Sequence, residues 1–138
     1  MITTAALIYG VAFVLIGILG YVPGVTTPDG MLLGIFHVNS AHNLVHIPSG
    51  IFALIAYSYG ARASQAYFRV FGWLYGLVAV IGFFVQHGNI LGFIANNPAD
   101  NWLHVLIAVT ALYVGYGLKE TEGERDRDIP LREAYRQY

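Results

Sequence analysis

The sequence predicts an all-α membrane protein: a four-transmembrane-helix bundle built as two helix hairpins in tandem. Of the 138 residues, 57% are hydrophobic and 11% are charged, against roughly 25% charged in an ordinary soluble domain. The mean hydropathy is +0.58. Only four charged residues precede Lys119, namely Asp29, Arg62, Arg69 and Asp100. So few charges cannot cover the surface of a soluble fold, which argues against a soluble globular enzyme.

Four apolar stretches are long enough to cross a bilayer core about 30 Å thick, which takes about 20 helical residues. We expect helices over about residues 3–22, 31–60, 67–87 and 101–118. Pro23-Gly24 ends the first, which exceeds the apolar run of a signal peptide and is expected to be retained. Pro48 interrupts the second. The runs are apolar on every side, which favours helices over the alternating strands of a membrane barrel.

The basic residues predict that both termini face the cytoplasm. Arg62 and Arg69 lie between the second and third helices, and five more basic residues lie in segment 119–138, whereas the opposite loops contain none. Because cytoplasmic flanks collect Lys and Arg, we expect an inner-membrane protein with residues 1–118 as its transmembrane domain and 119–138 as a charged cytoplasmic tail. The net charge of −1 argues against nucleic-acid binding, and the lack of cysteine excludes disulfides.

Two segments of the chain are similar to each other. Residues 39–46 (NSAHNLVH) and 97–104 (NPADNWLH) are identical at four of eight positions, including Asn43/Asn101 and His46/His104. A weaker match pairs Tyr9-Gly10 with Tyr75-Gly76. Since each hairpin returns to the same side of the membrane, this internal repeat predicts two parallel halves related by a pseudo-twofold axis along the membrane normal.

Polar residues form one stripe on the second helix. Asn39, His42, Asn43 and His46 share a face about 100° wide, and polar groups within a membrane are expensive to expose to lipid. The stripe must therefore face the interior of the bundle, in its outer half. By the repeat, we expect a second set to face it at similar depth, formed by Asp100, Asn101 and His104.

A metal site is one interpretation of this cluster. His42 with His46, and Asp100 with His104, are pairs at i and i+4, the spacing that brings two ligands to one face of a helix. Three imidazoles and a carboxylate suit a transition-metal ion such as Zn, Fe, Mn or Cu. The supporting partners that orient the ring nitrogens would then be Asn39, Asn43 and Asn101.

Three other interpretations remain open. Haem b could bind between His46 and His104, as bis-histidine ligation in helix bundles allows. A purely structural network could join Asn43 to His104 and Asn101 to His46 by hydrogen bonds across the axis. The cluster could also line a pocket for a polar small molecule or a quinone. In the structural reading, Asp100 would only cap the fourth helix.

Residues 36–46 (FHVNSAHNLVH) and 100–104 (DNWLH) resemble signatures of a family of small bacterial membrane proteins, catalogued as domain of unknown function 4383. The resemblance covers about residues 2–118 and implies four transmembrane helices but no activity. Many relatives have a longer loop between the first two helices than residues 23–30 here. A function seated in that loop is therefore not expected to carry over to this chain.

The function that we expect from the sequence is a non-enzymatic membrane protein with a buried His/Asn/Asp cluster that could bind a metal ion. The alternative is an accessory or structural subunit of a larger membrane complex, with segment 119–138 docking on a partner subunit. Homo-oligomers are also compatible with the glycines of the first and third helices. No nucleophile–base arrangement and no phosphate-binding loop is found in the sequence, which argues against an enzyme.

Overall fold

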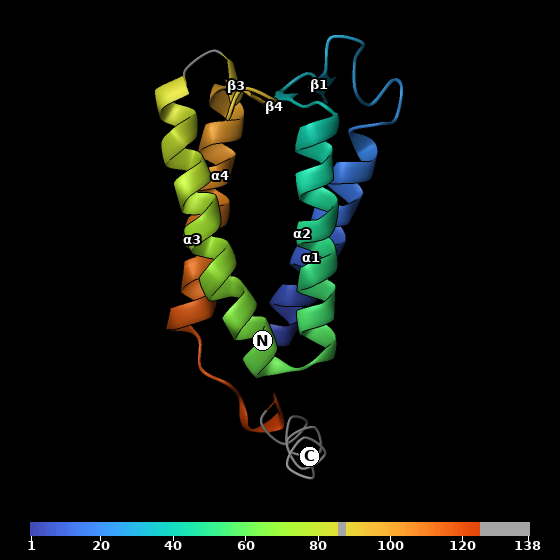
Figure 1. The fold of residues 1–138 in the computed structure, drawn as a ribbon. Coiled ribbons are helices and arrows are strands. Elements are labelled where there is room, and N and C mark those ends of the chain that lie inside the picture. Colours follow the sequence, from blue (N-terminus) through green and yellow to red (C-terminus); the bar gives the residue numbers. More distant parts are fainter. Residues whose placement is uncertain (86–87, 125–138) are drawn as a thin grey trace, which may run out of the picture.

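The chain forms four long helices and two small β-hairpins in the computed structural model, which describes residues 1–85 and 88–124 (Figure 1). The prediction of an all-α class is confirmed, because most of the described chain is helical. α1 and α3 are each long and apolar enough to cross a membrane. The helices are α1 (Ile2–Leu19), α2 (Ser40–Ser58), α3 (Ala61–Val85), α4 (Pro98–Leu112) and the π-helical turn η1 (Tyr113–Gly117), which continues α4.

The two β-hairpins precede α2 and α4 and lie together at one end of the molecule (Figure 1). β1 (Met31–Leu32) pairs antiparallel with β2 (Phe36–His37), and β3 (Gly88–Ile90) pairs antiparallel with β4 (Ile94–Asn96). Each turns through a Leu-Gly pair with positive φ, Leu33-Gly34 in one and Leu91-Gly92 in the other. Two successive residues with positive φ define a type I′ turn, which suits a tight hairpin. Neither hairpin was predicted from the sequence.

Three predicted helix boundaries are corrected by the structure. The second helix begins at Ser40 rather than near residue 31, because residues 31–37 form the first hairpin and the Asn39 side chain caps α2. The third begins at Ala61, before the predicted residue 67, and the fourth at Pro98, before residue 101. The predicted end of the third helix at His87 lies outside the described residues, as does most of the predicted tail.

Glycines bring the helices into two close pairs, α1 with α2 and α3 with α4. A Cβ placed on Gly50 would lie 2.6 Å from the Gly10 carbonyl oxygen, so these two backbones touch. Gly10 faces Leu54, and Gly72 faces Leu112 in the same manner. In its packing Gly72 therefore resembles Gly10, whereas the predicted match pairs Gly10 with Gly76, one helical turn further along α3.

An aromatic core joins the two pairs near the α2–α3 turn. Tyr9 and Phe13 of α1 pack edge to face on Phe68, Phe71 and Tyr75 of α3, with ring centroids 5.0–6.1 Å apart. These separations fall within the favourable range for aromatic pairs. The core holds the pairs together at this end, and the hairpins bridge them at the other.

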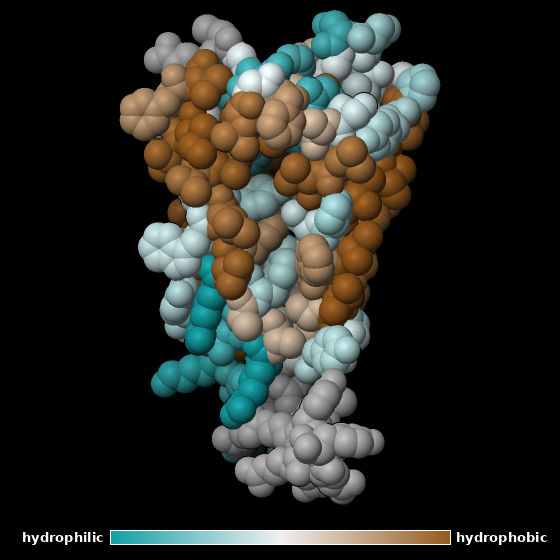
Figure 2. Space-filling view, in the orientation of Figure 1, coloured by the Kyte–Doolittle hydropathy of each residue, from teal (hydrophilic) through white to brown (hydrophobic). Residues whose placement is uncertain are grey.

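Large apolar side chains cover the outside of the helices. Figure 2 shows brown, hydrophobic surface along the helices. Phe84 is 85% exposed, Trp102 67% and Phe52 62%. A contiguous apolar exterior of this kind marks an interaction surface, because soluble monomers rarely expose large apolar patches.

A buried carboxylate joins the start of α1 to the segment after η1. Glu124 is only 5% exposed, and one of its carboxylate oxygens lies 2.5 Å from the Met1 ammonium group. The same oxygen accepts hydrogen bonds from the amide and the hydroxyl of Thr3, and the other oxygen accepts from Thr121. Burial raises the pKa of Glu124, but the ammonium and these hydrogen bonds outweigh it and lower the pKa to about 2.

This contact predicts a pH-dependent contribution to stability. Because the folded pKa of Glu124 is below its ordinary value of 4.5, the contribution is complete above pH 4.5 and is lost as the pH falls to about 2. The wild-type chain should melt roughly 5 °C above Glu124→Gln at pH 6, with the difference vanishing near pH 2. Thermal melts in detergent of both proteins, with unmodified N-termini, measure this difference. A gap that stays constant from pH 6 to pH 2 would contradict it.

Candidate metal centre

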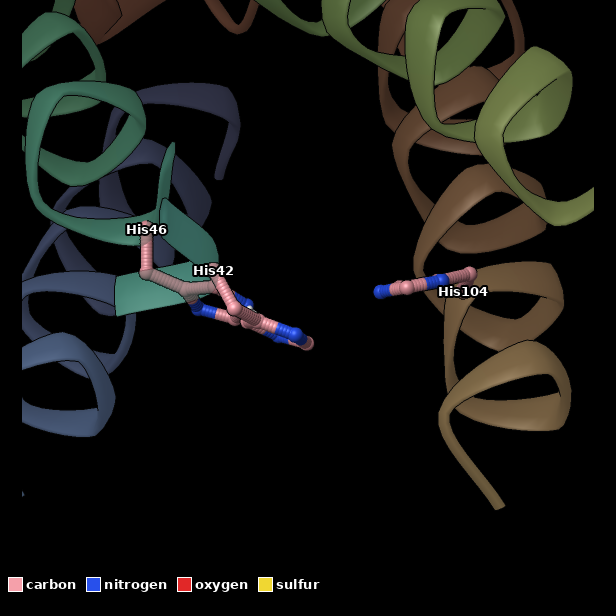
Figure 3. A group of neighbouring side chains, drawn as sticks. All are labelled: His42, His46 and His104. Atoms are coloured by element: carbon pink, nitrogen blue, oxygen red, sulfur yellow. Dashed lines mark hydrogen bonds between the residues drawn. The ribbon is translucent and has the colours of Figure 1, made fainter. Parts of the chain in front are cut away.

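Three buried histidines from the two helix pairs meet below the hairpins. His42 and His46 lie one turn apart on α2, and His104 lies on α4. Their exposed fractions are 5%, 4% and 5%. Figure 3 shows His42 and His46 together on α2, with the His104 ring pointing toward them from the other side. The structure thus brings together all three predicted imidazoles.

The N-terminal cap of α2 fixes where the His42 and His46 rings lie along the bundle. The Asn39 side chain accepts a hydrogen bond of 2.9 Å from the His42 amide, which starts α2 at this point. His46 then follows at i+4, and its ring stacks on His42 with centroids 4.8 Å apart. Phe13 of α1 stacks on the His46 ring at 4.9 Å. Both α2 rings are therefore held in place by neighbouring groups.

The three imidazoles offer nitrogens at nearly the spacing that a metal ion requires. Nε2 of His42 lies 3.0 Å from Nε2 of His46, and one nitrogen from each of the three rings lies within 4.8 Å of the others. Tetrahedral Zn–N bonds of about 2.0–2.1 Å place the nitrogens about 3.4 Å apart. The largest separation, 4.8 Å, exceeds this spacing by only about 1.4 Å.

A backbone carbonyl selects the ring form of His42. Its Nδ1 lies 2.8 Å from the carbonyl oxygen of Ala95 in β4. Because a carbonyl only accepts, Nδ1 carries the proton and Nε2 presents its lone pair to the other imidazoles. Metal-binding histidines commonly donate their second N–H to a backbone carbonyl in this way. Ala95 could not be predicted from the sequence, since a contact made by its backbone carbonyl does not depend on its side chain.

Two ring nitrogens at the site have no hydrogen-bond partner. Nδ1 of His46 and Nδ1 of His104 are both fully buried and unbonded. Buried polar atoms are almost always satisfied in native proteins, so each exception needs a physical explanation. A structural network of the four predicted residues does not provide one, because no hydrogen bond joins an asparagine amide to an imidazole within the described residues.

Asp100 lies outside the group of residues that could hold a metal ion. Its Oδ2 accepts hydrogen bonds from the Asn97 amide at 2.8 Å and from the His37 amide at 3.1 Å. With Asn97 it forms a capping box at the start of α4. The carboxylate is 2% exposed and joins α4 to the first hairpin, so among the described residues the group that could hold a metal ion consists of the three histidines.

The three predicted supporting asparagines have other partners. The Asn39 amide group donates to the Phe93 carbonyl at 2.8 Å, and Asn97 donates to the Ile35 carbonyl at the same distance. The asparagine that caps the helix of each half thus donates a hydrogen bond to the hairpin turn of the other half. Asn43 packs against Gly20 of α1, and Asn101 packs against Gly82 of α3; a Cβ on either glycine would lie 2.0–2.1 Å from the asparagine Oδ1. None of the three touches a ring nitrogen directly.

A cavity of about 340 Å³ lies against the cluster between α2 and α3. All three histidines line it, and its other walls come from α2, α3 and the second hairpin. Figure 2 shows the surface hollowed between α3 and α2, with paler side chains in the hollow. A second, smaller groove of about 210 Å³ lies between α1 and α4 and reaches only His46.

Comparison with protein families gives one match. The family model described as Domain of unknown function (DUF4383) matches residues 3–117, which include both helix pairs and the histidine cluster. No match was found among curated proteins or among solved structures.

Proposed function

The chain belongs to the family described as Domain of unknown function (DUF4383), and we propose that it is a non-enzymatic integral membrane protein that binds one transition-metal ion through His42, His46 and His104. The observation that carries the proposal is the convergence of three buried imidazoles, one of them fixed by the Ala95 carbonyl. An ion between the rings would be coordinated by Nε2 of His42 and Nε2 of His46, which lie only 3.0 Å apart. It would also link α2 to α4, and so one helix pair to the other.

If all four long helices cross the membrane, the exposed apolar side chains contact lipid rather than water. α2 has 19 residues and a length of about 28 Å, but its polar stripe lowers its hydropathy. α4 has 15 residues and continues through the five residues of η1, which together approach the bilayer core thickness. Arg62, Arg69 and Lys119 lie toward the end opposite the hairpins, which supports a cytoplasmic location for that end.

Tandem duplication accounts for the paired contacts of the two halves. Each half contains the same Leu-Gly turn, the same capping asparagine that reaches the opposite turn, and the same glycine–asparagine contact. At the position of His42, however, the second half has Asp100. The proposed site is therefore asymmetric: two ligands come from the first half and one from the second.

Haem fits this arrangement poorly. An iron bound axially by His46 and His104 would need free space in front of both rings. His42 Nε2 lies 3.0 Å from His46 Nε2 and occupies that space in front of His46. The geometry favours a small ion over a porphyrin, and three nitrogen donors favour zinc, copper, iron or nickel over magnesium or calcium.

Metal analysis tests the proposed function. Protein purified in mild detergent without a histidine tag should contain close to one transition-metal ion per chain, or take up one after incubation with Zn²⁺. Binding should raise the melting temperature, because an ion at 100 times its Kd contributes about 2.7 kcal/mol. A chain that remains metal-free and whose melting temperature does not change with Zn²⁺ would overturn the proposal. A Soret band would favour haem instead.

A further inference from the structure

We propose that the metal ion takes its fourth ligand from the membrane: the carboxylate of a lipid-like molecule whose hydrocarbon tail lies in the groove between α2 and α3. This inference rests on the proposed metal site. Three histidines leave one position of a tetrahedral ion unfilled by the protein, as in zinc sites that bind an exogenous ligand.

A ligand can reach the open coordination position of the ion through the cavity between α2 and α3. All three imidazoles line this cavity, and its volume of about 340 Å³ falls within the range of small-molecule sites. The α1–α4 groove reaches only His46, whose ring is covered there by Phe13. A ligand in the α2–α3 cavity can therefore reach the ion, whereas one in the α1–α4 groove cannot.

The mouth of the cavity is apolar and faces outward. Val45, Leu74 and Leu77 line it and are 42%, 56% and 58% exposed, on the surface that we assign to lipid. A molecule that enters here comes from the hydrocarbon phase. It must therefore be soluble in lipid over most of its length.

A second groove continues from the cavity toward the α2–α3 turn. Its volume is about 620 Å³, and it shares Ser49, Phe71 and Leu74 with the cavity. Pro48 and Ala66 belong to its walls, and among the described residues no Asp, Glu, Lys or Arg lines either space. The shape suits a compact head beside the histidines and an unbranched tail that runs along α2 and α3.

The charge of the metal site determines which chemical group the head of the lipid-like ligand carries. A divalent ion held by three neutral imidazoles carries two uncompensated positive charges in a buried site, and such charges are costly unless they are paired. In the described part of the chain, the buried carboxylate close to the cluster is that of Asp100, which is committed to the amides of His37 and Asn97. An anionic oxygen donor from the ligand would supply the missing charge, and a long-chain carboxylate combines that donor with the tail.

Cobalt-loaded protein provides the test. We expect the visible absorption bands of bound Co²⁺ to shift on addition of decanoate, with at least tenfold tighter apparent binding than acetate and than decanol. Ala66→Trp, which fills the groove away from the metal, should remove the advantage of decanoate over acetate. Ala12→Trp, in the α1–α4 groove, is the matched control and should leave it unchanged.

The possible outcomes separate the two proposals. Co²⁺ that binds but whose bands respond to none of the three probes overturns the lipid-like ligand and leaves the metal site standing. Equal binding of decanol and decanoate overturns the anionic donor. Equal loss in Ala66→Trp and Ala12→Trp overturns the assignment of the tail to the α2–α3 groove. A chain that binds no Co²⁺ overturns both proposals.

Discussion

Replacement of His104 by Leu is expected to reduce metal affinity at least 100-fold. Loss of even a residue that supports a ligand costs 10–100-fold in affinity, and loss of one of three ligands costs more. In the proposed site His104 is also the ligand from the second helix pair, so the remaining two imidazoles, both on α2, could not link the halves. Isothermal titration with Zn²⁺ and metal analysis of the purified variant measure the change.

The control for this variant is His37→Gln. His37 lies in β2 at the same end of the molecule but outside the metal-ligating group, and it engages Asp100 through its backbone amide. Its replacement should leave Zn²⁺ affinity within about twofold of wild type. His104→Leu should still fold, because leucine removes a buried ring nitrogen that has no hydrogen-bond partner. In the absence of metal, its melting temperature should be at least as high as that of the wild-type chain. Wild-type Zn²⁺ affinity in His104→Leu would refute the assignment.

Replacement of Gly50 by Ala should destabilise the fold by about 3 kcal/mol, the upper part of the range for overpacked cores. The new Cβ would lie 2.6 Å from the Gly10 carbonyl oxygen and 2.7 Å from the Val14 amide nitrogen. Both atoms belong to the α1 backbone, so relief requires α1 and α2 to separate along their contact. Thermal melts in detergent should show a decrease of roughly 10 °C.

Gly76→Ala is the matched control, since Gly76 is also a helical glycine at a helix contact. Its Cβ would meet Ala108 at 3.8 Å, an ordinary van der Waals distance. Alanine has the higher helix propensity, so this variant should melt at or slightly above the wild-type temperature. If both alanine variants melt alike, the close approach of α1 and α2 is not a determinant of stability.

Much of the site could be predicted from residue spacing alone. His42 and His46 are one turn apart on any helix, and polar residues in an apolar segment must face protein rather than lipid. The similarity of residues 39–46 and 97–104 then indicated His104 as the residue opposite them, and the structure brings all three rings together. These inferences depend on local periodicity, which the chain carries in its order of residues.

The asparagines and Asp100 were harder to assign, for a physical reason. A carboxylate or amide can cap a helix, bind a metal or bridge two segments, and spacing does not distinguish these uses. Asp100 has its capping partner Asn97 three residues away, but its second partner, the His37 amide, comes from the other half of the chain. The match between the first and third helices was equally hard to assign, because Gly72 and Gly76 differ only in the residues that lie across from them.

By itself, the sequence determined the helical class, the apolar segments and the inward stripe of histidines, because hydropathy and helical period are properties of neighbouring residues. Only the tertiary structure decided which ring nitrogen His42 presents, which groove reaches all three rings, and where the hairpins cross between the halves. Those features depend on the Ala95 carbonyl, on the packing of Phe13 against His46, and on turns that reach the opposite half. Contacts between distant backbone groups arise only once the helices are packed.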